Sequence, residues 1–178
     1  MAHRHKNRCS THFHYSDFIL CGDAYNKSNI DNSPRENGSY EAISLLSAKL
    51  MDPIVGKFGS IILTSGFRSS LLLRHIKKRF APRIDQHCAL EKNSKGKLIC
   101  QRAGAAADFY HQTVNSLDIS KYIVSSLPFD RLYYYGDDKP LHVSYGPDHA
   151  HKISNMVFRA HKDRYYPRNI SREDFLKL

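Results

Sequence analysis

Residues 104–110 read Gly-Ala-Ala-Ala-Asp-Phe-Tyr, small apolar residues up to Asp108 and aromatic residues after it. Such a run is typical of a strand in a protein core. A carboxylate inside a core is costly unless hydrogen-bond donors, a cation or a metal satisfies it. The fold must therefore bring polar partners to Asp108, and the identity of those partners constrains both the fold and the function.

The other apolar patterns alternate between helices and short strands. Apolar residues recur at intervals of three and four over residues 39–51, which predicts an amphipathic helix. This helix is expected to restart or kink at Asp52-Pro53 and to end at Gly59. Further predicted elements are helices at 71–80, from Ser116 or Asp118 to 127, and after Ser171, and strands at 61–64, 131–135 and 141–145. The last two strands form a hairpin around the turn at 136–140.

The sequence contains no internal repeat or linker. With 178 residues it is expected to form a single α+β domain over residues 12–178, preceded by a basic flexible arm at 1–11. No apolar run reaches the roughly 18 residues of a membrane span. The polar, basic start also lacks the apolar segment of a secretory signal. These features predict a cytoplasmic protein that does not enter membranes.

The chain has 27 Lys and Arg against 17 Asp and Glu, a formal charge of +10. Such an excess is typical of proteins with polyanionic partners such as nucleic acid, although a solvated basic surface without a partner is an equal alternative. The charge is clustered in two segments. One contains Arg74, Lys77, Lys78, Arg79 and Arg83; the other contains Arg159, Lys162, Arg164 and Arg168, interleaved with Tyr165 and Tyr166.

The four cysteines, Cys9, Cys21, Cys88 and Cys100, are too few for a disulfide scaffold in a chain of this size. Cys88 and Cys100 bracket one polar loop and are near enough in sequence to meet. In a cytoplasmic protein, however, free and structural thiols are expected.

Two histidines join Asp108 as candidate metal ligands. His87 precedes the strand that contains Asp108, and His142 lies on a later strand. A catalytic zinc site uses three ligands from His, Asp or Glu and leaves a fourth position to water. Arg68 supplies a cation that can stabilise a developing oxyanion. Each residue alone is more often a satisfied structural group than a ligand.

The combination resembles a known family. Thr-Ser-Gly-Phe-Arg-Ser at 64–69 is similar to the S-G-[YF]-R-S motif of the zinc D-alanyl-D-alanine carboxypeptidase-like peptidases of the VanY type. That family continues with S-Q-H-x-x-G-x-A-x-D and ends with a strand reading W-x-H-V-S-[FY]. The chain has Asp-Gln-His at 85–87, Gly-Ala-Ala-Ala-Asp at 104–108 and Leu-His-Val-Ser-Tyr at 141–145. The resemblance covers residues 12–146.

The resemblance implies the fold shared by hedgehog signalling domains and these peptidases, a small antiparallel sheet flanked by helices. It implies one Zn²⁺ held by His87, Asp108 and His142. Arg68, Ser65 and Gln86 would bind the substrate, a peptide or a peptidoglycan fragment.

The chain departs from the family at the first ligand. The family places that histidine seven residues before the aspartate, where this chain has Gln101. Either an insertion separates His87 from Asp108, or Gln101 has replaced the ligand. The Gln-His dipeptide at 86–87 favours the insertion.

The family's general-base glutamate, which precedes the last histidine, is also missing from this chain. Asp137, Asp138 and Glu91 are the candidates for that role, and Asp137 is the first choice. The alternative is that both aspartates are ordinary turn residues.

Two functions follow from these observations. The first is a zinc-dependent hydrolase that cleaves a peptide bond by metal-activated water, acting on a cytosolic substrate or released by lysis as a phage lysin is. The second is a catalytically impaired zinc-binding module that binds nucleic acid or a protein through its basic surfaces.

Overall fold

A computed structural model describes residues 4–76 and 82–178 and shows six strands in one sheet. The strands are β1 (Ile62–Ser65), β2 (Ala105–Tyr110), β3 (Arg131–Tyr134), β4 (Leu141–Tyr145), β5 (Lys152–Arg159) and β6 (Arg164–Ile170). The helices are α1 (Tyr15–Ile19), α2 (Asp23–Asn26), α3 (Asn37–Leu46), α4 (Asp52–Phe58), α5 (Ser70–His75), α6 (Ser116–Ser126) and α7 (Arg172–Leu176). Short helical turns are η1 (Arg4–Lys6), η2 (Ser47–Met51), η3 (Pro82–Ile84), η4 (Gln86–Cys88) and η5 (Ala160–Lys162). This arrangement confirms the α+β class.

The sheet is mixed, so the expectation of an antiparallel sheet is wrong. The strand order is β1-β2-β4-β3-β5-β6, and β3 and β5 run parallel while the other neighbours are antiparallel. The chain leaves β4 and crosses to the far side of β3 instead of folding back on β4. Buried Asp130 holds this crossing, because its carboxylate accepts a hydrogen bond from the Ala150 amide at 2.9 Å and its carbonyl accepts one from the Lys152 amide at 2.9 Å.

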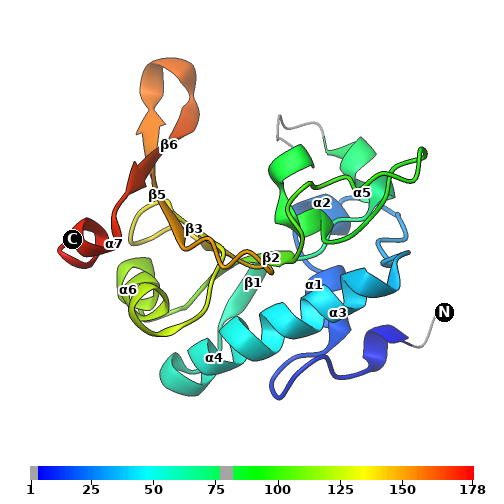
Figure 1. Ribbon diagram of the computed structural model, residues 1–178, viewed down its shortest axis with the longest axis horizontal. Helices are drawn as coiled ribbons and strands as arrows, with labels where there is room; N and C mark the ends of the chain where they lie inside the picture. Colours follow the sequence, from blue (N-terminus) through cyan, green and yellow to red (C-terminus); the bar gives the residue numbers. More distant parts are fainter. Residues whose placement is uncertain (1–3, 77–81) are drawn as a thin grey trace.

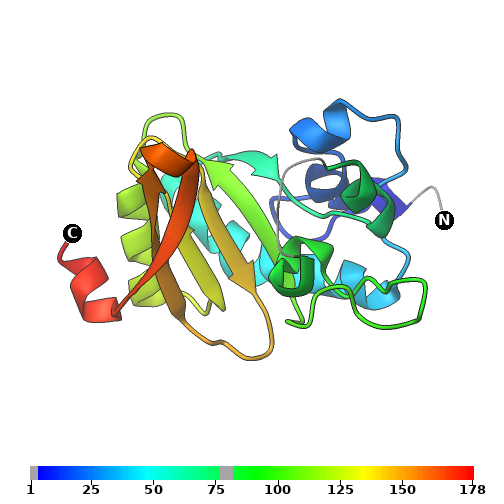
Figure 2. The ribbon, with the colours of Figure 1, turned by 90° about the horizontal axis from the view of Figure 1, so that it is seen from above.

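Helices α3, α4 and α6 lie along one face of the sheet (Figures 1 and 2). Side chains alternate between the two faces of a strand. In β2, Ala105, Ala107 and Phe109 join the hydrophobic core on the helical side. Asp108 therefore points to the opposite face, and its cross-strand neighbour His142 points the same way. The alternation that builds the core thus brings two polar side chains together on the other face.

Residues 37–58 form a nearly continuous helical run, which confirms the predicted helix and its interruption. Helix α3 passes into the π-helical turn η2, and α4 then begins at Asp52 with Pro53 in its first turn. Proline lacks an amide donor and disturbs the regular helical ladder. At Gly59, φ is 92°, a left-handed value that glycine adopts without strain and that ends the helix.

The segment expected to be a flexible arm is folded from Arg4 onward. Arg4–Lys6 form η1, and Cys9 is buried in the core. The Asp52 carboxylate accepts hydrogen bonds from the Ser10 hydroxyl at 2.8 Å and from the Thr11 amide at 2.9 Å. These contacts tie the segment to the start of α4. The domain therefore begins before residue 12.

Sequence patterns missed the hairpin of β5 and β6. The sequence predicts no strand between Tyr145 and Ser171, only the helix that follows Ser171. That helix is α7, and the Ser171 side chain caps it by accepting from the Asp174 amide. Residues 157–164 are all exposed, so neither face of the outer hairpin shows an apolar period. Pro167 lies on the edge strand β6, where a missing amide donor is tolerated.

Helix α5 begins after Ser69, whose side chain accepts from the Leu72 amide, and it ends at His75. The rest of the helix predicted at 71–80, with Lys77, Lys78 and Arg79 of the first basic cluster, lies outside the described residues. Within the described ranges, the helices are all too short or too polar to cross a membrane.

Buried thiols make folding stability sensitive to alkaline pH. All four cysteines are free, as expected. Burial raises the pKa of the Cys9 thiol from 9.0 to about 11 and raises that of Cys88 further. The unfolded chain therefore loses these protons from about pH 9 upward while the folded chain keeps them, so the thiols' contribution to stability is constant below about pH 9 and falls above it.

We expect Cys9 alone to account for about 1 kcal/mol of the loss near pH 10. Urea unfolding of Cys9→Ser and of the parent chain, each near pH 7 and near pH 10, measures this contribution. The variant should lose less stability over that interval than the parent. Equal losses would show that Cys9 ionises equally in both states.

Candidate metal centre

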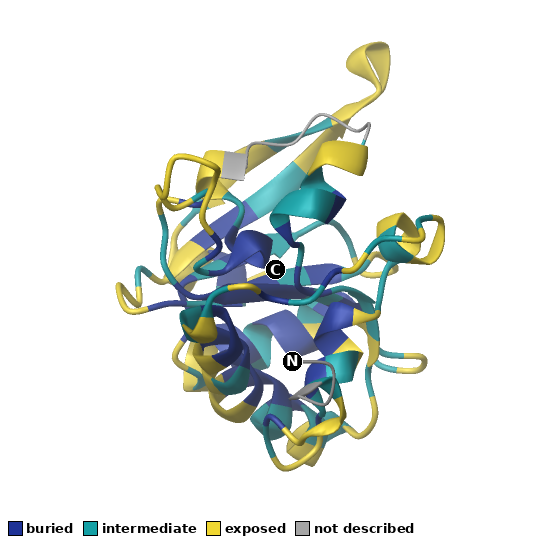
Figure 3. Cartoon of the chain, turned by 90° about the vertical axis from the view of Figure 1, so that its right-hand side faces the viewer, coloured by how far each residue is buried: buried dark blue, intermediate teal, exposed yellow. Residues whose placement is uncertain are grey.

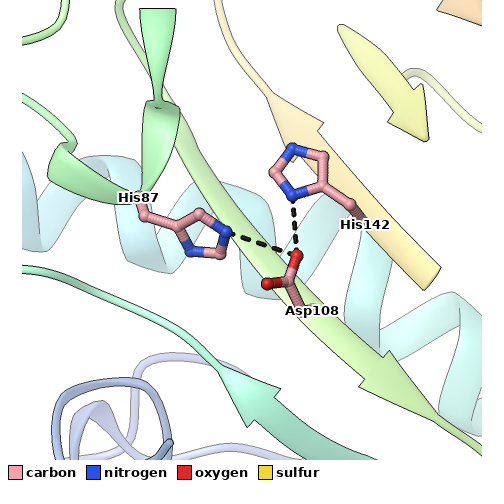
Figure 4. Close-up of side chains that lie close together, drawn as sticks. All are labelled: His87, Asp108 and His142. Carbon is pink, nitrogen blue, oxygen red and sulfur yellow. Dashed lines mark hydrogen bonds and ion pairs between the residues drawn. The ribbon is translucent and has the colours of Figure 1, made fainter. Parts of the chain in front are cut away.

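His87, Asp108 and His142 converge on the face of the sheet opposite the helices (Figure 4). One Asp108 oxygen, Oδ1, lies 2.7 Å from His142 Nδ1 and 3.3 Å from His87 Nε2. The three potential ligand atoms lie within 4.8 Å of one another. His87 is 3% exposed, so it points into the protein and toward Asp108. The structure therefore brings together all three candidate ligands that the sequence suggested.

Two of these residues are positioned by the sheet and one by a helical turn. Asp108 and His142 are directly paired in the antiparallel ladder of β2 and β4. His87 comes from η4, which Asp85 caps by accepting from the His87 amide at 3.1 Å. The His87 carbonyl accepts from the Arg68 amide at 2.9 Å. The turn is thus fixed against the loop that follows β1.

The loop beside η4 also determines which nitrogen of His87 faces Asp108. His87 Nδ1 lies 2.6 Å from the Gly66 carbonyl oxygen. A carbonyl only accepts hydrogen bonds, so Nδ1 must carry a proton and Nε2 presents its lone pair in the neutral ring. Gly66 is required here, because a Cβ atom at that position would lie 2.3 Å from the Phe18 carbonyl oxygen. Metal-binding histidines commonly donate their other N–H to a carbonyl in this way.

His142 is held between an aromatic ring and Asp108. Tyr133 stacks on it with ring centroids 4.7 Å apart and planes at 12°. Its Nδ1 donates a hydrogen bond of 2.7 Å to Asp108 Oδ1. A metal bound at Nδ1 would take the place of the donated proton, so binding is expected to release protons.

Asp108 remains ionised at neutral pH. Desolvation raises the pKa of its carboxyl. The positive charge that His87 has when both of its ring nitrogens are protonated, together with the hydrogen bonds from both imidazoles, outweighs this and holds the pKa well below its ordinary value. The Arg68 guanidinium, 3.8 Å from Oδ2, adds positive charge nearby. Asp108 is therefore available as an anionic ligand.

The donor set of two imidazoles and one carboxylate suits Zn²⁺. Ligands at about 2.0–2.1 Å from a tetrahedral ion lie roughly 3.3 Å apart. His87 Nε2 and Asp108 Oδ1 are already 3.3 Å apart, the distance that such an ion requires. His142 Nδ1 and Asp108 Oδ1 are 2.7 Å apart and must move away from each other when the ion binds. The side chains of Asp108 and His142 are 26% and 11% exposed, which leaves a route for a further ligand. The residues present thus fit a zinc ion with an open position.

Arg68 and Ser65 lie beside this centre. Ser65 Oγ accepts from Arg68 Nη2 at 2.8 Å, and Asp85 Oδ2 accepts from Arg68 Nη1 at 2.8 Å. The guanidinium is thereby held in one orientation. It lines a pocket of about 590 Å³ together with Ser65 and Asp108. Both residues therefore face the pocket beside Asp108.

Gln86 does not face that pocket, contrary to its predicted role in substrate binding. Its side chain is buried, and its amide donates to the Ala103 carbonyl at 2.8 Å and to Asp130 at 2.7 Å. Its Oε1 accepts from the Ser144 hydroxyl at 2.8 Å. These bonds fasten η4 to the sheet and leave the amide occupied. Gln86 therefore positions its neighbour His87 instead of contacting substrate.

His87 and Gln101 were the two alternatives for the first ligand, and they differ in where they lie relative to Asp108. Gln101 is exposed, and its backbone N–H donates a hydrogen bond to the Arg83 carbonyl at 2.8 Å. His87, not Gln101, faces Asp108. Between them, residues 92–98 form an exposed, polar loop of the kind that an insertion would produce.

Each of the three carboxylates suggested as the general base is engaged by other residues of the protein and is not free to act at the metal centre. Glu91 is buried, and its Oε1 accepts from the Arg35 amide at 3.0 Å and the Ser39 hydroxyl at 2.9 Å, which caps the start of α3. The Asp137 carboxylate accepts from the Tyr134 hydroxyl, and the Tyr134 ring packs against Phe175 on the helical side of the sheet.

Asp138 pairs with Lys139 at 2.8 Å in the exposed turn. The prediction that Asp137 is the general base is wrong, because its side chain binds the Tyr134 hydroxyl and is directed away from His142.

Sequence reasoning missed Tyr135, which lies next to the centre. A second pocket of about 270 Å³ is lined by Tyr135, Tyr165, Thr64 and Asp108. Burial and the charge of Asp108 raise the pKa of the Tyr135 hydroxyl, so it remains protonated. Strand alternation could have indicated it, because residues two apart on a strand share a face. Tyr135 lies two residues after Tyr133, whose ring stacks on His142. Thr64 and Asp108 line both pockets, so the pockets adjoin at Asp108.

Comparisons of the chain with protein-family models, with curated protein sequences and with solved structures gave no match. The peptidase resemblance stays a prediction from the motif residues. The functional interpretation therefore depends on the chemistry and geometry of the residues described above.

Proposed function

We propose that the protein is a zinc-dependent hydrolase that cleaves a peptide bond, with His87, Asp108 and His142 as the ligands. The observation that carries this proposal is the orientation of His87. Its Nδ1 is bound to the Gly66 carbonyl, so Nε2 and a carboxylate oxygen face each other at 3.3 Å. A histidine held by the fold in one tautomer beside an ionised carboxylate is typical of a metal ligand.

The two adjoining pockets suggest how a peptide would lie. Arg68 in the larger pocket would bind the carboxylate at the end of the substrate, since a guanidinium pairs with carboxylates through two parallel hydrogen bonds. Tyr135 and Tyr165 in the smaller pocket would contact the residue on the other side of the bond that is cleaved. The substrate class that best suits this arrangement is a short peptide with a free carboxyl end, such as a peptidoglycan stem peptide.

Bound zinc would supply a water molecule of lowered pKa and would polarise the substrate carbonyl. The protein's own residues contribute orientation and charge. Asp85 and Ser65 keep Arg68 in place, and the protonated Tyr135 hydroxyl can donate a hydrogen bond to an oxygen that gains negative charge. The Tyr133 ring fixes the plane of His142.

A second candidate is a zinc-binding module without catalysis. The observation that favours it is the engagement of Glu91 and Asp137 elsewhere, which leaves neither of them available as a base beside the centre. Asp85 is itself paired with Arg68. Such a module would bind zinc and leave every peptide intact.

Hydrolysis by the proposed enzyme should depend on Arg68 in a way that reveals the substrate carboxylate. Arg68→Ala should lower kcat/KM about 10- to 100-fold for peptides with a free carboxyl end, because a charged hydrogen bond is lost. The same peptides with an amidated end should be cleaved equally slowly by the parent and the variant. The measurement is a panel of stem peptides and their amides, assayed by mass spectrometry with and without a chelator.

Arg68→Lys serves as the matched variant, since it keeps the charge and loses the forked geometry, and an intermediate rate is expected. Equal losses on free and amidated peptides would remove the carboxylate role of Arg68. Hydrolysis that persists after chelation would contradict the zinc mechanism. Zinc binding without hydrolysis of any peptide would select the second candidate.

A further inference from the structure

The β5–β6 hairpin extends away from the rest of the molecule (Figure 1). Only its base is buried, at Ile153 and Ser154, and its outer part is exposed (Figure 3). The exposed turn at 160–163 consists of Ala, His, Lys and Asp. A protruding ribbon of this kind contributes little to the core, so its composition calls for a different explanation.

Cross-strand pairing divides the side chains of the hairpin between two faces. Val157 pairs with Tyr166 and Arg159 with Arg164, so these four side chains lie on one face. Phe158 pairs with Tyr165, and these lie on the other face. Arg168, two residues beyond Tyr166, belongs to the first face. We call this first face, with Arg159, Arg164, Tyr166 and Arg168, the basic face.

The basic face concentrates positive charge. Residues 152–170 contain five Lys and Arg and one Asp. The Arg159 and Arg164 guanidinium groups lie 4.8 and 5.2 Å from the centroid of the Tyr166 ring, and Lys162 Nζ lies 5.8 Å from it. Among the described residues, none of these cations forms an ion pair with a carboxylate. Three like charges gathered around one ring repel one another, and an external anion would relieve that repulsion.

We propose that the basic face binds the phosphate backbone of a nucleic-acid duplex. A two-stranded β-ribbon has the width to enter a DNA major groove. Arginine predominates on this face, and its fork of donors matches phosphate oxygens. Tyr166 is covered by cations and is not free to stack on an unpaired base, which favours a duplex over a single strand. The turn at 160–163 lacks the large apolar side chains that insertion into a lipid surface requires.

This binding surface does not depend on the zinc-hydrolase proposal. The opposite face of the hairpin, with Phe158 and Tyr165, packs toward Tyr135, since the Tyr135 and Tyr165 rings are 5.1 Å apart at 82°. Tyr165 also lines the smaller pocket beside Asp108. A duplex on the basic face would therefore leave the pocket accessible, and the two sites are expected to bind independently.

The test compares two charge-matched double variants with the parent chain. R159A/R164A removes two arginines of the basic face, and K95A/K97A removes two exposed lysines of the surface loop. Fluorescence anisotropy with a labelled DNA duplex gives the dissociation constant over a range of salt concentrations. Circular dichroism and thermal unfolding show that each variant is folded, which is expected because all four side chains are exposed.

We expect the parent chain to bind the duplex with a steep salt dependence, as counterion release requires. R159A/R164A should weaken binding about 10- to 30-fold at moderate salt and reduce the slope of log K against log salt by roughly two. K95A/K97A should change both quantities far less. Equal effects of the two variants would overturn the proposal, as would a flat salt response. Binding to vesicles of anionic lipid without binding to the duplex would also overturn it.

Discussion

Replacing His142 with alanine should remove zinc from the protein. The parent chain is expected to purify with, or to take up, about one zinc per chain. His142 supplies one of three ligand atoms, and its Nδ1 lies 2.7 Å from Asp108. Loss of a hydrogen-bonded partner of a ligand already weakens metal affinity about 10- to 100-fold, so loss of the ligand itself should weaken it more. Dialysis against buffered zinc, followed by elemental analysis of the protein, measures the stoichiometry and the affinity.

The matched variant is His161→Ala, which removes an exposed histidine of the η5 turn and should leave zinc binding unchanged. Zinc should raise the thermal unfolding temperature of the parent chain and of His161→Ala, because a ligand that binds only the folded state stabilises it. His142→Ala should show no such rise. A parent chain that takes up no zinc would reduce the three residues to a hydrogen-bonded cluster and would exclude both zinc functions.

The parts of the fold that follow from local patterns could be predicted from the sequence. The strand containing Asp108, the hairpin that contains His142 and the long helix with its interruption at Pro53 all show a clear apolar period. The β5–β6 hairpin shows none, because both of its faces are exposed beyond Met156. The parallel pairing of β3 with β5 depends on the buried carboxylate of Asp130, and nothing local to Asp130 specifies that contact.

Some residues of the candidate site could likewise be predicted from the sequence, and others could not. His87, Asp108 and His142 could be suggested because their residue types are those of metal ligands. The roles of Gln86 and Glu91 could not, because a buried polar side chain is explained only by its partners, and these lie far away in sequence. Gln86 binds Asp130 and Ser144, and Glu91 caps a helix that begins more than fifty residues earlier. The resemblance suggested a substrate-binding role for Gln86, and Glu91 was a candidate base only through its place near the insertion.

Replacing Tyr135 with glutamate should increase peptide hydrolysis. The family that the motifs resemble carries a glutamate shortly before the last histidine, and Tyr135 is the residue of that segment that lines the pocket with Asp108. Its hydroxyl stays protonated, because burial and Asp108 raise its pKa, and it cannot accept a proton at neutral pH. A carboxylate at this position can. General-base catalysis contributes typically 10²- to 10⁴-fold, and loss of the Tyr135 hydroxyl as a donor offsets part of that gain, so kcat/KM should rise by about 10-fold in the zinc-loaded variant.

Tyr135→Gln is the matched control, because glutamine has the size of glutamate and cannot take up the proton at neutral pH. It opens the pocket to the same extent, so an equal gain in both variants would show that access, not base catalysis, limits the parent chain. Asp108 would repel a second carboxylate, and the charge of a bound metal would offset much of that repulsion. Tyr135→Glu should therefore depend on zinc for its stability more than Tyr135→Gln does, and thermal unfolding with and without a chelator measures the difference. If Tyr135→Glu binds zinc as the parent chain does and gains no activity, position 135 does not face the bond that is cleaved.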